Sequence, residues 1–419
     1  MEEWKEYNVS DAPLVALTDL VEFIVDNRGK TVPTAAKGIK LIATNCIKNE
    51  YLYPLYEKVR YVSEDIYNSW FRSHPKPGDI VFVNKGTPGK CALVPDPVDF
   101  CIAQDMMAFR LKSDLVYNTY LLAILRSRGI QSFIMNNQVG TIIPHFKKEQ
   151  LKTLMIPLPE MHIQKRIGDL YFNFSEKTEI NRRINENLEQ QAQALFKSWF
   201  VDYEPFKDGE FVESELGMIP KGWRVGTLDE IGDVVGGSTP SKSKPEYYTK
   251  NGIAWLTPKD LSVLNAKFTA KGEIDITEEG YYSCSTKLMP KGTVLFSSRA
   301  PIGYITIAKN DICTNQGFKS VVPKTAGTAF IYYFLKTSTK EIENKATGST
   351  FKEASGALMK SLQLVIAPKT IYDVFEIALT PILNEQEVLE DESHRLAALR
   401  DTLLPKLMSG ELKVNDIKA

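Results

Sequence analysis

The sequence has few of the residue types that bind metals or form disulfides. It holds five cysteines, an odd number without a CxxC pair, and four histidines that lie far apart. Such a set predicts unpaired thiols, many of them buried as small hydrophobic residues, and not a zinc site or a disulfide framework. The cysteines are Cys46, Cys91, Cys101, Cys284 and Cys313.

Long hydrophobic runs are also missing. No apolar stretch approaches the roughly 18 to 20 residues that a membrane span needs, and the first residues, MEEWKEYNVS, are acidic and have no apolar segment of the kind found in secretory signals. With 43% hydrophobic and 25% charged residues, the 419-residue chain has the composition of a globular protein of about two to four domains. We therefore expect a cytoplasmic protein that does not contact a membrane.

Catalytic motifs are absent as well. There is no GxxxxGK[ST] phosphate loop and no Asn/Asp-Pro-Pro-Tyr tetrad of the amino-methyltransferases. The glycine-rich VVGGSTPS (234–241) lacks GxGxxG spacing and is interpreted as a turn. Cys101 and Cys313 recur at matching places, but no histidine recurs with them, which favours buried thiols over nucleophiles. The sequence therefore predicts a binding protein without catalytic residues and no metal site.

The charge is segregated although the net charge is only −1. Residues 28–90 hold eleven basic and five acidic residues, and residues 236–309 hold ten and six. The following stretches are acidic, with twelve acids against seven bases in 160–215 and eight against four in 369–409. This alternation suggests two surfaces that bind a polyanion, with ordinary solvated faces as the alternative interpretation.

The chain contains a long internal repeat. Three pairs of stretches match at offsets of 214, 212 and 208 residues: KPGDIVFVNKGTPGK (76–90) with MPKGTVLFSSRAPIGY (289–304), CIAQD (101–105) with CTNQG (313–317), and VGTIIPHFKKEQLKTLMIPLP (139–159) with TGSTFKEASGALMKSLQLVIAP (347–368). Because the offset drifts by only six residues, we expect two halves of similar structure.

Each half is predicted to begin with short strands and to continue into helices. The runs DIVFV and TVLFS, bounded by glycine and proline, are typical of strands. A short amphipathic helix is expected at 118–134 and again at 329–345. A long polar segment with helical periodicity follows each half, from 161 to 203 and again beyond Pro368.

The apolar stripes of the two long helices are narrow, which favours a pair of helices packed as a short coiled coil over a helix lying on a globular core. Polar residues in this seam would fix its register, and Pro381 is expected to separate a short lead-in helix from the long one. The expected packing positions are Ile184, Leu188, Leu195, Leu389, Leu396, Leu399 and Leu403, and the polar ones are Asn181, Gln191, Glu392 and Lys406.

The helices end in related segments. KDGEF (207–211) follows the first helix as MSGEL (408–412) follows the second. If the helices are antiparallel, the end of each half lies beside the start of the other, and the arrangement is circular. The aromatic segment QALFKSWFVDYEPF (193–206) would then be one of two equivalent junctions, with Trp199, Phe200 and Tyr203 in a core and Leu407 in the place of Trp199.

The chain resembles the specificity subunit of type I restriction-modification systems over essentially its whole length. The second copy departs from the family pattern, with YDVF (372–375) where QKRI is expected, so its first helical turn is expected to contact partners differently. The matching elements are FIVDNRGKTVP (23–33), KPGDIVFVNKGTPGK with its counterpart, GSTFK (348–352), PLPEMHIQKRI (157–167), ALFKSWFVDYEP (194–205) and LLPKLMSGEL (403–412).

The resemblance implies an α+β fold with two similar β-rich target-recognition domains, separated by two long antiparallel helices that form a coiled coil in a pseudo-twofold, circular arrangement. The expected boundaries are 1–157 for the first recognition domain, 158–205 for the central helical region, 206–222 for a linker, 223–367 for the second recognition domain, 368–412 for the distal helical region and 413–419 for a tail.

The resemblance also implies a function. Each recognition domain would read one half of a bipartite site in double-stranded DNA, and the helices would set the spacer and dock two methyltransferase subunits. A helix of about 40 residues is about 60 Å long, or about 17 base pairs. Restriction and translocase subunits are expected partners. No cofactor is expected in this chain, whereas S-adenosylmethionine and ATP with magnesium are expected on the partner subunits.

Within each domain, basic side chains are expected to meet phosphates, and a few polar side chains on loops are expected to read bases. The candidates are Arg28, Lys30, Thr31, Asn45, Lys85, Lys90, Gln104 and Thr141 in the first half, and Ser238, Thr239, Lys242, Lys244, Lys259, Arg299, Gln316, Ser349 and Lys352 in the second. Two alternatives stay open: a coiled-coil scaffold whose modules bind protein, and a DNA enzyme with an unrecognised active site.

Overall fold

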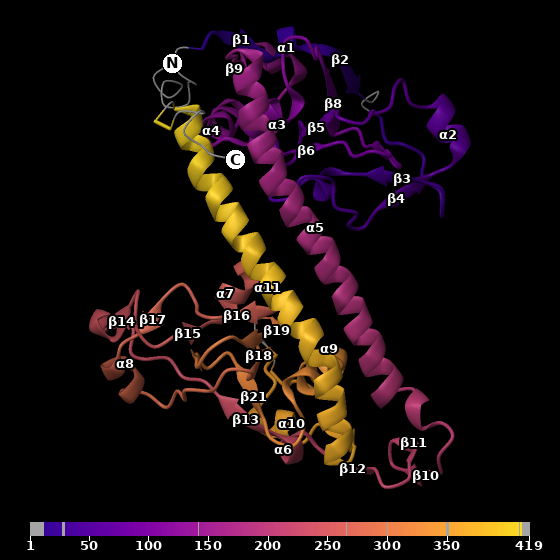
Figure 1. Cartoon of the computed structure of the whole chain (residues 1–419), viewed down its shortest axis with the longest axis vertical. Coiled ribbons are helices and arrows are strands. Elements are labelled where there is room, and N and C mark those ends of the chain that lie inside the picture. The colour runs from indigo at the N-terminus through magenta and orange to yellow at the C-terminus, as the bar shows by residue number, and fades with distance from the viewer. Residues whose placement is uncertain are drawn as a thin grey trace. The chain divides into compact units, whose positions relative to one another are not determined.

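The computed structural model describes residues 12–26, 30–140, 142–264, 266–299, 301–348, 352–409 and 411–412. The chain divides into two compact units, the first formed by Met1–Asn181 with Glu392–Ala419 and the second by Arg182–Asp391. Both long helices, α5 (Met161–Phe200) and α11 (Lys369–Met408), pass from one unit into the other (Figure 1). The first unit therefore combines two segments that are far apart in the sequence.

Two sheets form the β-rich part of the first unit. One has the strand order β2-β8-β5-β6 and the other β4-β3-β7, while β1 pairs with β9. The elements are β1 (Leu14–Ala16), α1 (Leu17–Leu20), β2 (Val21–Asp26), β3 (Ile39–Ile42), β4 (Arg60–Val62), α2 (Glu64–Ser69), β5 (Ile80–Val83), β6 (Cys91–Leu93), β7 (Phe100–Ile102), β8 (Met106–Leu111), α3 (Asn118–Arg126), α4 (Arg128–Asn137) and β9 (Met155–Pro157).

The apolar run in β5 is explained by burial on both faces of the strand. Ile80 and Phe82 pack in one core with the residues of α3. Val81 and Val83 point to the opposite face and pack in a second core with residues of β3 and β7. Because successive side chains of a strand alternate between faces, a strand between two cores is apolar at every position.

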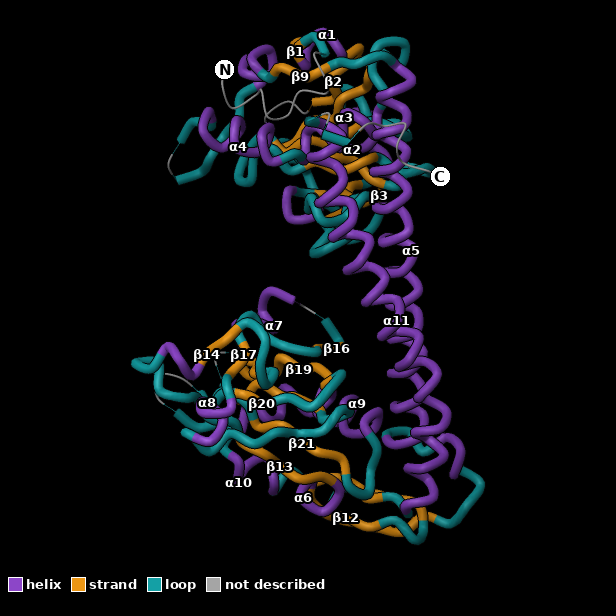
Figure 2. The backbone as a smooth tube through the Cα atoms, turned by 60° about the vertical axis from the view of Figure 1, so that its left-hand side comes forward, coloured by secondary structure: helices purple, strands orange, loops and turns teal. Residues whose placement is uncertain are grey.

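The second unit has a larger sheet with the order β13-β21-β18-β19-β16, and Figure 2 shows its strands β13 and β21 side by side. Its elements are β10 (Phe211–Ser214), β11 (Gly217–Pro220), β12 (Arg224–Thr227), α6 (Leu228–Ile231), β13 (Gly232–Gly236), β14 (Tyr248–Thr249), β15 (Trp255–Leu256), α7 (Pro258–Leu264), β16 (Phe268–Thr269), β17 (Asp275–Ile276), α8 (Glu278–Tyr282), β18 (Val294–Ser298), β19 (Ile302–Ala308), β20 (Cys313–Thr314), β21 (Lys319–Pro323), α9 (Thr328–Lys345), α10 (Gly356–Lys360) and β22 (Gln363–Ile366).

The internal repeat is confirmed strand by strand. The order β2-β8-β5-β6 of the first unit corresponds to β13-β21-β18-β19 of the second, and the pair β1 and β9 corresponds to β12 and β22. Each unit also holds a short parallel pair at the matching place, β3 with β7 and β15 with β20. The second unit adds a parallel pair of β16 with β19, which has no counterpart in the described part of the first unit. The segment expected to be a plain linker, 206–222, contains the hairpin of β10 and β11.

The units differ in the helix that follows the strands. The second unit has the single helix α9, as expected, but the first has two, α3 and α4. The break lies at Ser127, which is extended (φ −62, ψ 150) and whose hydroxyl accepts a hydrogen bond from the backbone N–H of Ile130. A serine in this role starts a new helix, so the single helix predicted at 118–134 was wrong.

Within each unit the segments of α5 and α11 run antiparallel. In the first unit Asn181 donates to Glu392 at 2.7 Å, and Tyr171 lies 5.8 Å from the guanidinium of Arg400. In the second unit Gln386 donates to the carbonyl of Asn185 at 3.3 Å, and Phe200 stacks on Tyr372. In both units the partner's number falls as the α5 number rises, which is the antiparallel order.

The expected packing positions on these helices are buried to different degrees. Leu389 is only 5% exposed, whereas Ile184 is 40% and Leu399 is 42% exposed, so these two residues differ from the expectation. Leu188, Leu195, Leu396 and Leu403 are half-buried. The most buried apolar side chains face the globular parts instead, such as Ile167 and Tyr171 in the first unit and Phe196, Phe375 and Leu379 in the second.

Helix α11 continues through Pro381, so the separate lead-in helix was a wrong prediction. Proline removes one backbone N–H and with it the bond to the carbonyl four residues earlier, here that of Ile377. Pro381 is exposed and Ile377 lies on the solvent-facing side of the helix. Water can therefore satisfy that carbonyl, and the helix is not broken.

The expected circular closure is confirmed within the first unit. Met408, in the last turn of α11, is buried in the same core as Leu17 and Tyr120, and Leu404 packs against that core. At the corresponding place in the second unit, Phe200 stacks on Tyr372 and Trp199 lies 5.6 Å from Phe375. The aromatic segment is thus part of a core, as predicted.

Candidate nucleic-acid interface

The first unit gathers several predicted residues at one edge of its sheets. β3 and β7 are parallel and pair Ile42 with Ile102, so the segments that follow them leave the sheet together. Asn45 lies just after β3 and Gln104 just after β7, and the N–H of Ala103 donates to the carbonyl of Ile42 at 2.9 Å. The polar side chains of both loops therefore lie at one edge.

The loop after β5 reaches the same edge. The backbone N–H groups of Asn84 and Lys85 donate to the carbonyl of Asp105 at 3.1 and 3.3 Å, and the Lys85 Nζ lies 3.8 Å from the Asp105 carboxylate. Lys85 also forms a β-bridge with His145. The backbone of Lys85 is therefore held against both Asp105, the residue after Gln104, and His145.

The second unit builds the same edge from equivalent residues. β15 and β20 are parallel, and Lys259 and Gln316 lie in the segments that follow them. Arg299 follows β18 and forms a β-bridge with Glu353, as Lys85 does with His145. The side chain of Arg299 lies 3.6 Å from that of Glu353.

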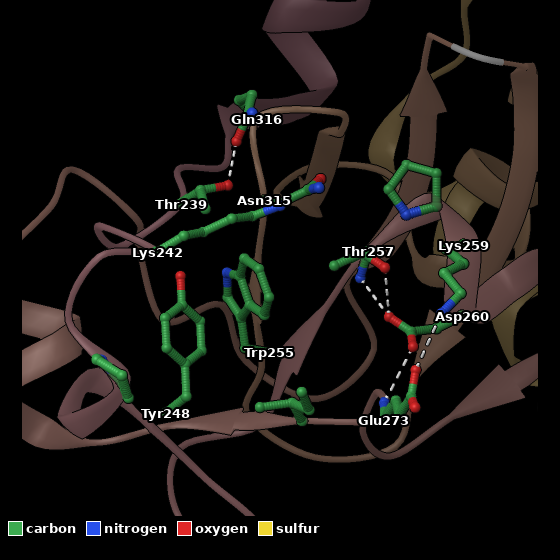
Figure 3. A pocket seen from close by; sticks show the side chains of 13 residues that line it. Thr239, Lys242, Tyr248, Trp255, Thr257, Lys259, Asp260, Glu273, Asn315 and Gln316 are labelled. Carbon is green, nitrogen blue, oxygen red and sulfur yellow. Dashed lines mark hydrogen bonds and ion pairs between the residues drawn. The ribbon is translucent and has the colours of Figure 1, made fainter.

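A pocket of about 650 Å³ opens at this edge of the second unit (Figure 3). Four of the predicted residues line it, namely Thr239, Lys242, Lys259 and Gln316. The Thr239 hydroxyl donates to the side-chain carbonyl of Gln316, which leaves the amide N–H₂ of Gln316 available as a donor.

Two aromatic rings hold the loop that carries Thr239. Trp255 and Tyr248 are in edge-to-face contact at 5.9 Å, and their side chains lie next to each other in Figure 3. The indole N–H of Trp255 donates to the carbonyl of Ser238 at 3.1 Å, and the hydroxyl of Tyr248 donates to that of Pro240 at 2.6 Å. Sequence reasoning missed both rings, because nothing local distinguishes them from core aromatics.

The glycines of VVGGSTPS also have a specific role here. A Cβ on Gly237 would lie 2.1 Å from the carbonyl oxygen of Asn315, and the N–H of Ser238 donates to the carbonyl of Thr314 at 2.9 Å. The chain therefore passes directly against the segment after β20. The prediction of a turn for 234–241 was wrong, because residues 234–236 are the end of strand β13 and residues 237–241 are irregular. The close contact at Gly237 places Thr239 beside Gln316.

The buried carboxylate in the pocket is structural. Asp260 accepts hydrogen bonds from the N–H and hydroxyl of Thr257, both at 2.7 Å, and from the N–H of Glu273 at 3.0 Å. These bonds fix the segment between β15 and β17, which includes Lys259. The Lys259 ammonium lies 3.3 Å from the Glu273 carboxylate.

Other predicted residues lie apart from the pocket. Lys244 donates to the hydroxyl of Tyr247 at 2.9 Å, and Lys352 donates to the carbonyl of Glu343 at 3.3 Å. In the first unit Lys30 and Thr31 are exposed and Lys90 is half-buried in the loop after β5. Arg28, Thr141 and Ser349 lie outside the described residues.

Part of the positive charge counted in the sequence is neutralised locally. Lys40 pairs with Asp99 and Lys48 with Glu57 in the first unit. In the second, Lys309 pairs with Asp391 and Glu387. Lys242 is exposed and forms no ion pair with any residue in the described part of the chain. The free charge is thus concentrated at fewer positions than the counts suggest.

The lysine before β16 belongs to a buried network that sequence reasoning missed. The Lys267 ammonium donates to the Glu189 carboxylate of α5 and to the Gln386 amide of α11, both at 2.7 Å, and the N–H of Lys267 donates to Glu390 at 3.1 Å. Burial alone would raise the pKa of Glu189, but Lys267 and Lys336 lower it to about 2. This network joins the β-rich part of the second unit to both helices.

The cysteines are unpaired, and Cys46, Cys91, Cys101 and Cys313 are buried, as expected. Burial raises the pKa of Cys101 to about 12 and that of Cys313 to about 11, which makes the thiolate form less favourable than at an exposed cysteine. Across the described ranges, the acidic, cysteine and histidine side chains form no cluster that could hold a metal ion. No helix in those ranges is apolar over a length that could span a membrane.

The chain is similar to known specificity subunits. It is 44% identical over 191 residues to the type I restriction enzyme MjaIX specificity subunit of Methanocaldococcus jannaschii, a match that covers 43% of this chain and 44% of that protein, less than half of its length. It is 24% identical over 404 residues to the type I restriction enzyme HindI specificity subunit of Haemophilus influenzae, covering 80% of this chain and 87% of that one.

A solved structure shares the fold. The crystal structure of the type I restriction-modification system S subunit from M. genitalium matches 95% of this chain and 96% of its own, with a TM-score of 0.60 and 17% identity. The family model described as type I restriction modification DNA specificity domain matches twice, at residues 13–190 and 220–389. These two matches cover most of the chain and fall on the two repeated halves, so the chain belongs to the family of type I restriction-modification specificity subunits.

Proposed function

We propose that the chain is the sequence-specific DNA-recognition subunit of a type I restriction-modification complex, and that each unit reads one half of a bipartite duplex target. One observation carries this proposal. The same edge of both units presents a basic residue after the central strand, Lys85 or Arg299, and a glutamine after the parallel pair, Gln104 or Gln316.

These residue types suit a division of roles on DNA. Lysine and arginine meet phosphates and position the protein, whereas a glutamine amide can both donate to and accept from the edge of a base. At Gln316 the hydroxyl of Thr239 holds the amide in one orientation. An amide held in this way discriminates between bases better than one that rotates freely, because the donor and the acceptor have fixed places.

The long helices would set the spacer and dock two methyltransferase subunits, and restriction and translocase subunits would join the same complex. Methyl transfer and cleavage would then belong to those partners, which would bind S-adenosylmethionine and ATP with magnesium. The exposed apolar side chains of α11 at Val374, Ile377 and Val388 support a partner surface on that helix.

The test is DNA binding by the chain with its methyltransferase partner, measured against salt. Lys242→Ala should weaken binding to all sequences alike and reduce the slope of log K against log salt by about 1. Gln316→Ala should relax the preference at one base pair of one half-site, at a cost of about 1 to 3 kcal/mol.

The controls carry the same substitutions away from the edge. Lys221→Ala changes an exposed residue just after β11, and Gln363→Ala changes an exposed residue of β22. Both variants should leave the affinity for DNA and the base preference unaltered. If the complex protects no bipartite site at any salt concentration, the proposal fails. Binding that survives charge reversal at Lys85 and Lys242 would favour the protein-binding scaffold, and methyl transfer by the isolated chain would favour the enzyme.

A further inference from the structure

The loop 139–146 of the first unit exposes large apolar side chains. Ile142 is 93% exposed and Ile143 is 54% exposed. Val139, at the start of the loop, and Met135, on the preceding helix α4, are exposed as well. Apolar groups in water at this density are unfavourable for an isolated protein and indicate a contact surface.

Hydrogen bonds fix the two ends of this loop. The N–H groups of Val139 and His145 each donate to the carbonyl of the other residue, at 2.8 and 2.9 Å. Gly140 has φ +95, and a Cβ there would lie 2.8 Å from the carbonyl oxygen of Ile143. The ends of the loop are therefore joined at Val139 and His145, and the backbone at Gly140 is one that only glycine adopts without strain.

The base of the loop is tied to the edge that carries Lys85. The N–H of Gly86 donates to the carbonyl of Pro144 at 2.9 Å, and the N–H of Phe146 donates to the carbonyl of Asn84 at 2.8 Å. Phe146 is fully buried in the core beneath. The position of the isoleucines relative to Lys85 is thus fixed by the fold.

Lysines lie beside the isoleucines. Lys147 follows the loop and is exposed, and Lys85, whose ammonium lies 3.8 Å from the Asp105 carboxylate, pairs through its backbone with His145. The isoleucines are held against the edge that carries Lys85, and a duplex offers phosphates to cations and apolar base faces and thymine methyl groups between the phosphates. Continuity with the edge assigned to DNA therefore favours DNA as the occupant.

We propose that Ile142 and Ile143 form an apolar wedge that enters the half-site read by the first unit and unstacks one base step. This proposal rests on the proposed function and deepens it, because it assigns to these residues a contact made with base faces and not with base edges. Side chains such as isoleucine act in this way in other DNA-binding proteins, where burial of the apolar group offsets the cost of unstacking.

The sequence of the second half is consistent with an equivalent device. At the same offset of 208, Thr350 and Phe351 correspond to Ile142 and Ile143. These two residues lie outside the described ones. Among the described residues on either side of them, the bridge between Thr347 and Glu353 matches the bridge between Val139 and His145.

The experiment uses the full chain with its methyltransferase partner and duplexes that carry 2-aminopurine at successive positions of each half-site. Binding of the unaltered protein should raise 2-aminopurine fluorescence at one step of one half-site. The double variant Ile142→Ser with Ile143→Ser should abolish that rise and weaken specific binding by about tenfold or more, as expected for the loss of two buried isoleucines. The slope against salt should not change, because no phosphate contact is removed.

The matched control is Leu115→Ser, which changes a side chain 42% exposed on the turn before α3, and should change neither readout. Lys85→Ala tests the proposed function separately, since it should weaken binding and reduce the salt slope. If Lys85→Ala has that effect while the double variant binds within twofold and keeps the fluorescence rise, the wedge is wrong and the proposed function stands. Loss of assembly with the methyltransferase, without any change in the fluorescence rise, would likewise overturn the wedge.

Discussion

Gly236 and Gly237 are neighbours in the sequence, but only Gly237 has no room for a side chain. The nearest atom to a Cβ on Gly236 lies 3.9 Å away, whereas a Cβ on Gly237 would lie 2.1 Å from a backbone carbonyl. Backbone cannot move aside as the end of a flexible side chain can. The difference between the two glycines is therefore a difference in packing against the segment after β20, which holds Thr239 beside Gln316.

We predict that Gly237→Ala lowers the free energy of unfolding by about 1 to 3 kcal/mol, the usual cost of overpacking. Gly236→Ala should change it by about 0.5 kcal/mol or less, as at an ordinary surface position. Denaturant unfolding of the two variants checks this pair. Equal stability of both variants would show that the contact with Asn315 relaxes without cost.

For single residues, the sequence predicts only part of the candidate interface. It predicted Lys85, Gln104, Arg299 and Gln316 by their places in the repeat, and the fold brings them to equivalent edges. Their role in DNA binding stays a prediction. The sequence could not identify Trp255 or Lys267. The roles of these residues depend on contacts with residues elsewhere in the chain, and such contacts leave no local pattern in the sequence.

Among the helices and strands, those with a local sequence signal could be predicted, and features that depend on distant contacts could not. Strands such as β5 were predictable, since an apolar run is a local signal, and so were the two long helices. The break at Ser127 and the continuity of α11 through Pro381 were not. The face that each long helix buries is set by the globular part it meets, and this explains why Ile184 and Leu399 are exposed although their spacing fits a seam.

The buried network around Glu189 should make stability depend on pH. The pKa of Glu189 is about 2 in the folded chain against 4.5 as its ordinary value. A lowered carboxyl pKa contributes stability that is fully present above about pH 4.5 and is lost as the pH falls toward 2. The contribution lost between pH 7 and pH 3 is on the order of 2 kcal/mol.

Glu189→Gln should remove this part of the acid sensitivity, so that its free energy of unfolding falls less between pH 7 and pH 3 than that of the unaltered chain. Glu186→Gln, one turn earlier on α5 and more exposed, should retain the full dependence. Denaturant unfolding at both pH values, followed by tryptophan fluorescence, measures the difference. An unchanged pH dependence in Glu189→Gln would contradict an ionised, paired Glu189.

For the whole molecule, the repeat predicted two units of one topology and the closure of the last helix on the first unit, and both are confirmed. These features were accessible because a repeat of more than 200 residues constrains architecture more strongly than any single element does. The spacer function of the helices stays a prediction. The spacer function depends on the length of the two helices and not on a single contact.

We expect that inserting about four residues into an exposed part of α5 near Arg183 changes the recognised spacer by about two base pairs, since each residue adds about 1.5 Å of helix. Both half-sites should keep their sequences. Selection from a duplex library with randomised spacer length measures this. A changed half-site with the old spacer would contradict the prediction.

The two units are completed at different times during translation. The second unit is one continuous segment, Arg182–Asp391, whereas the first needs Met408 to complete the core around Tyr120. At roughly 5 to 20 residues per second, a ribosome takes about 10 to 45 seconds to travel from the end of the first unit's opening segment to Met408. Throughout that time the core around Tyr120 lacks Met408, so the first unit is completed after the second, although its opening segment is translated first.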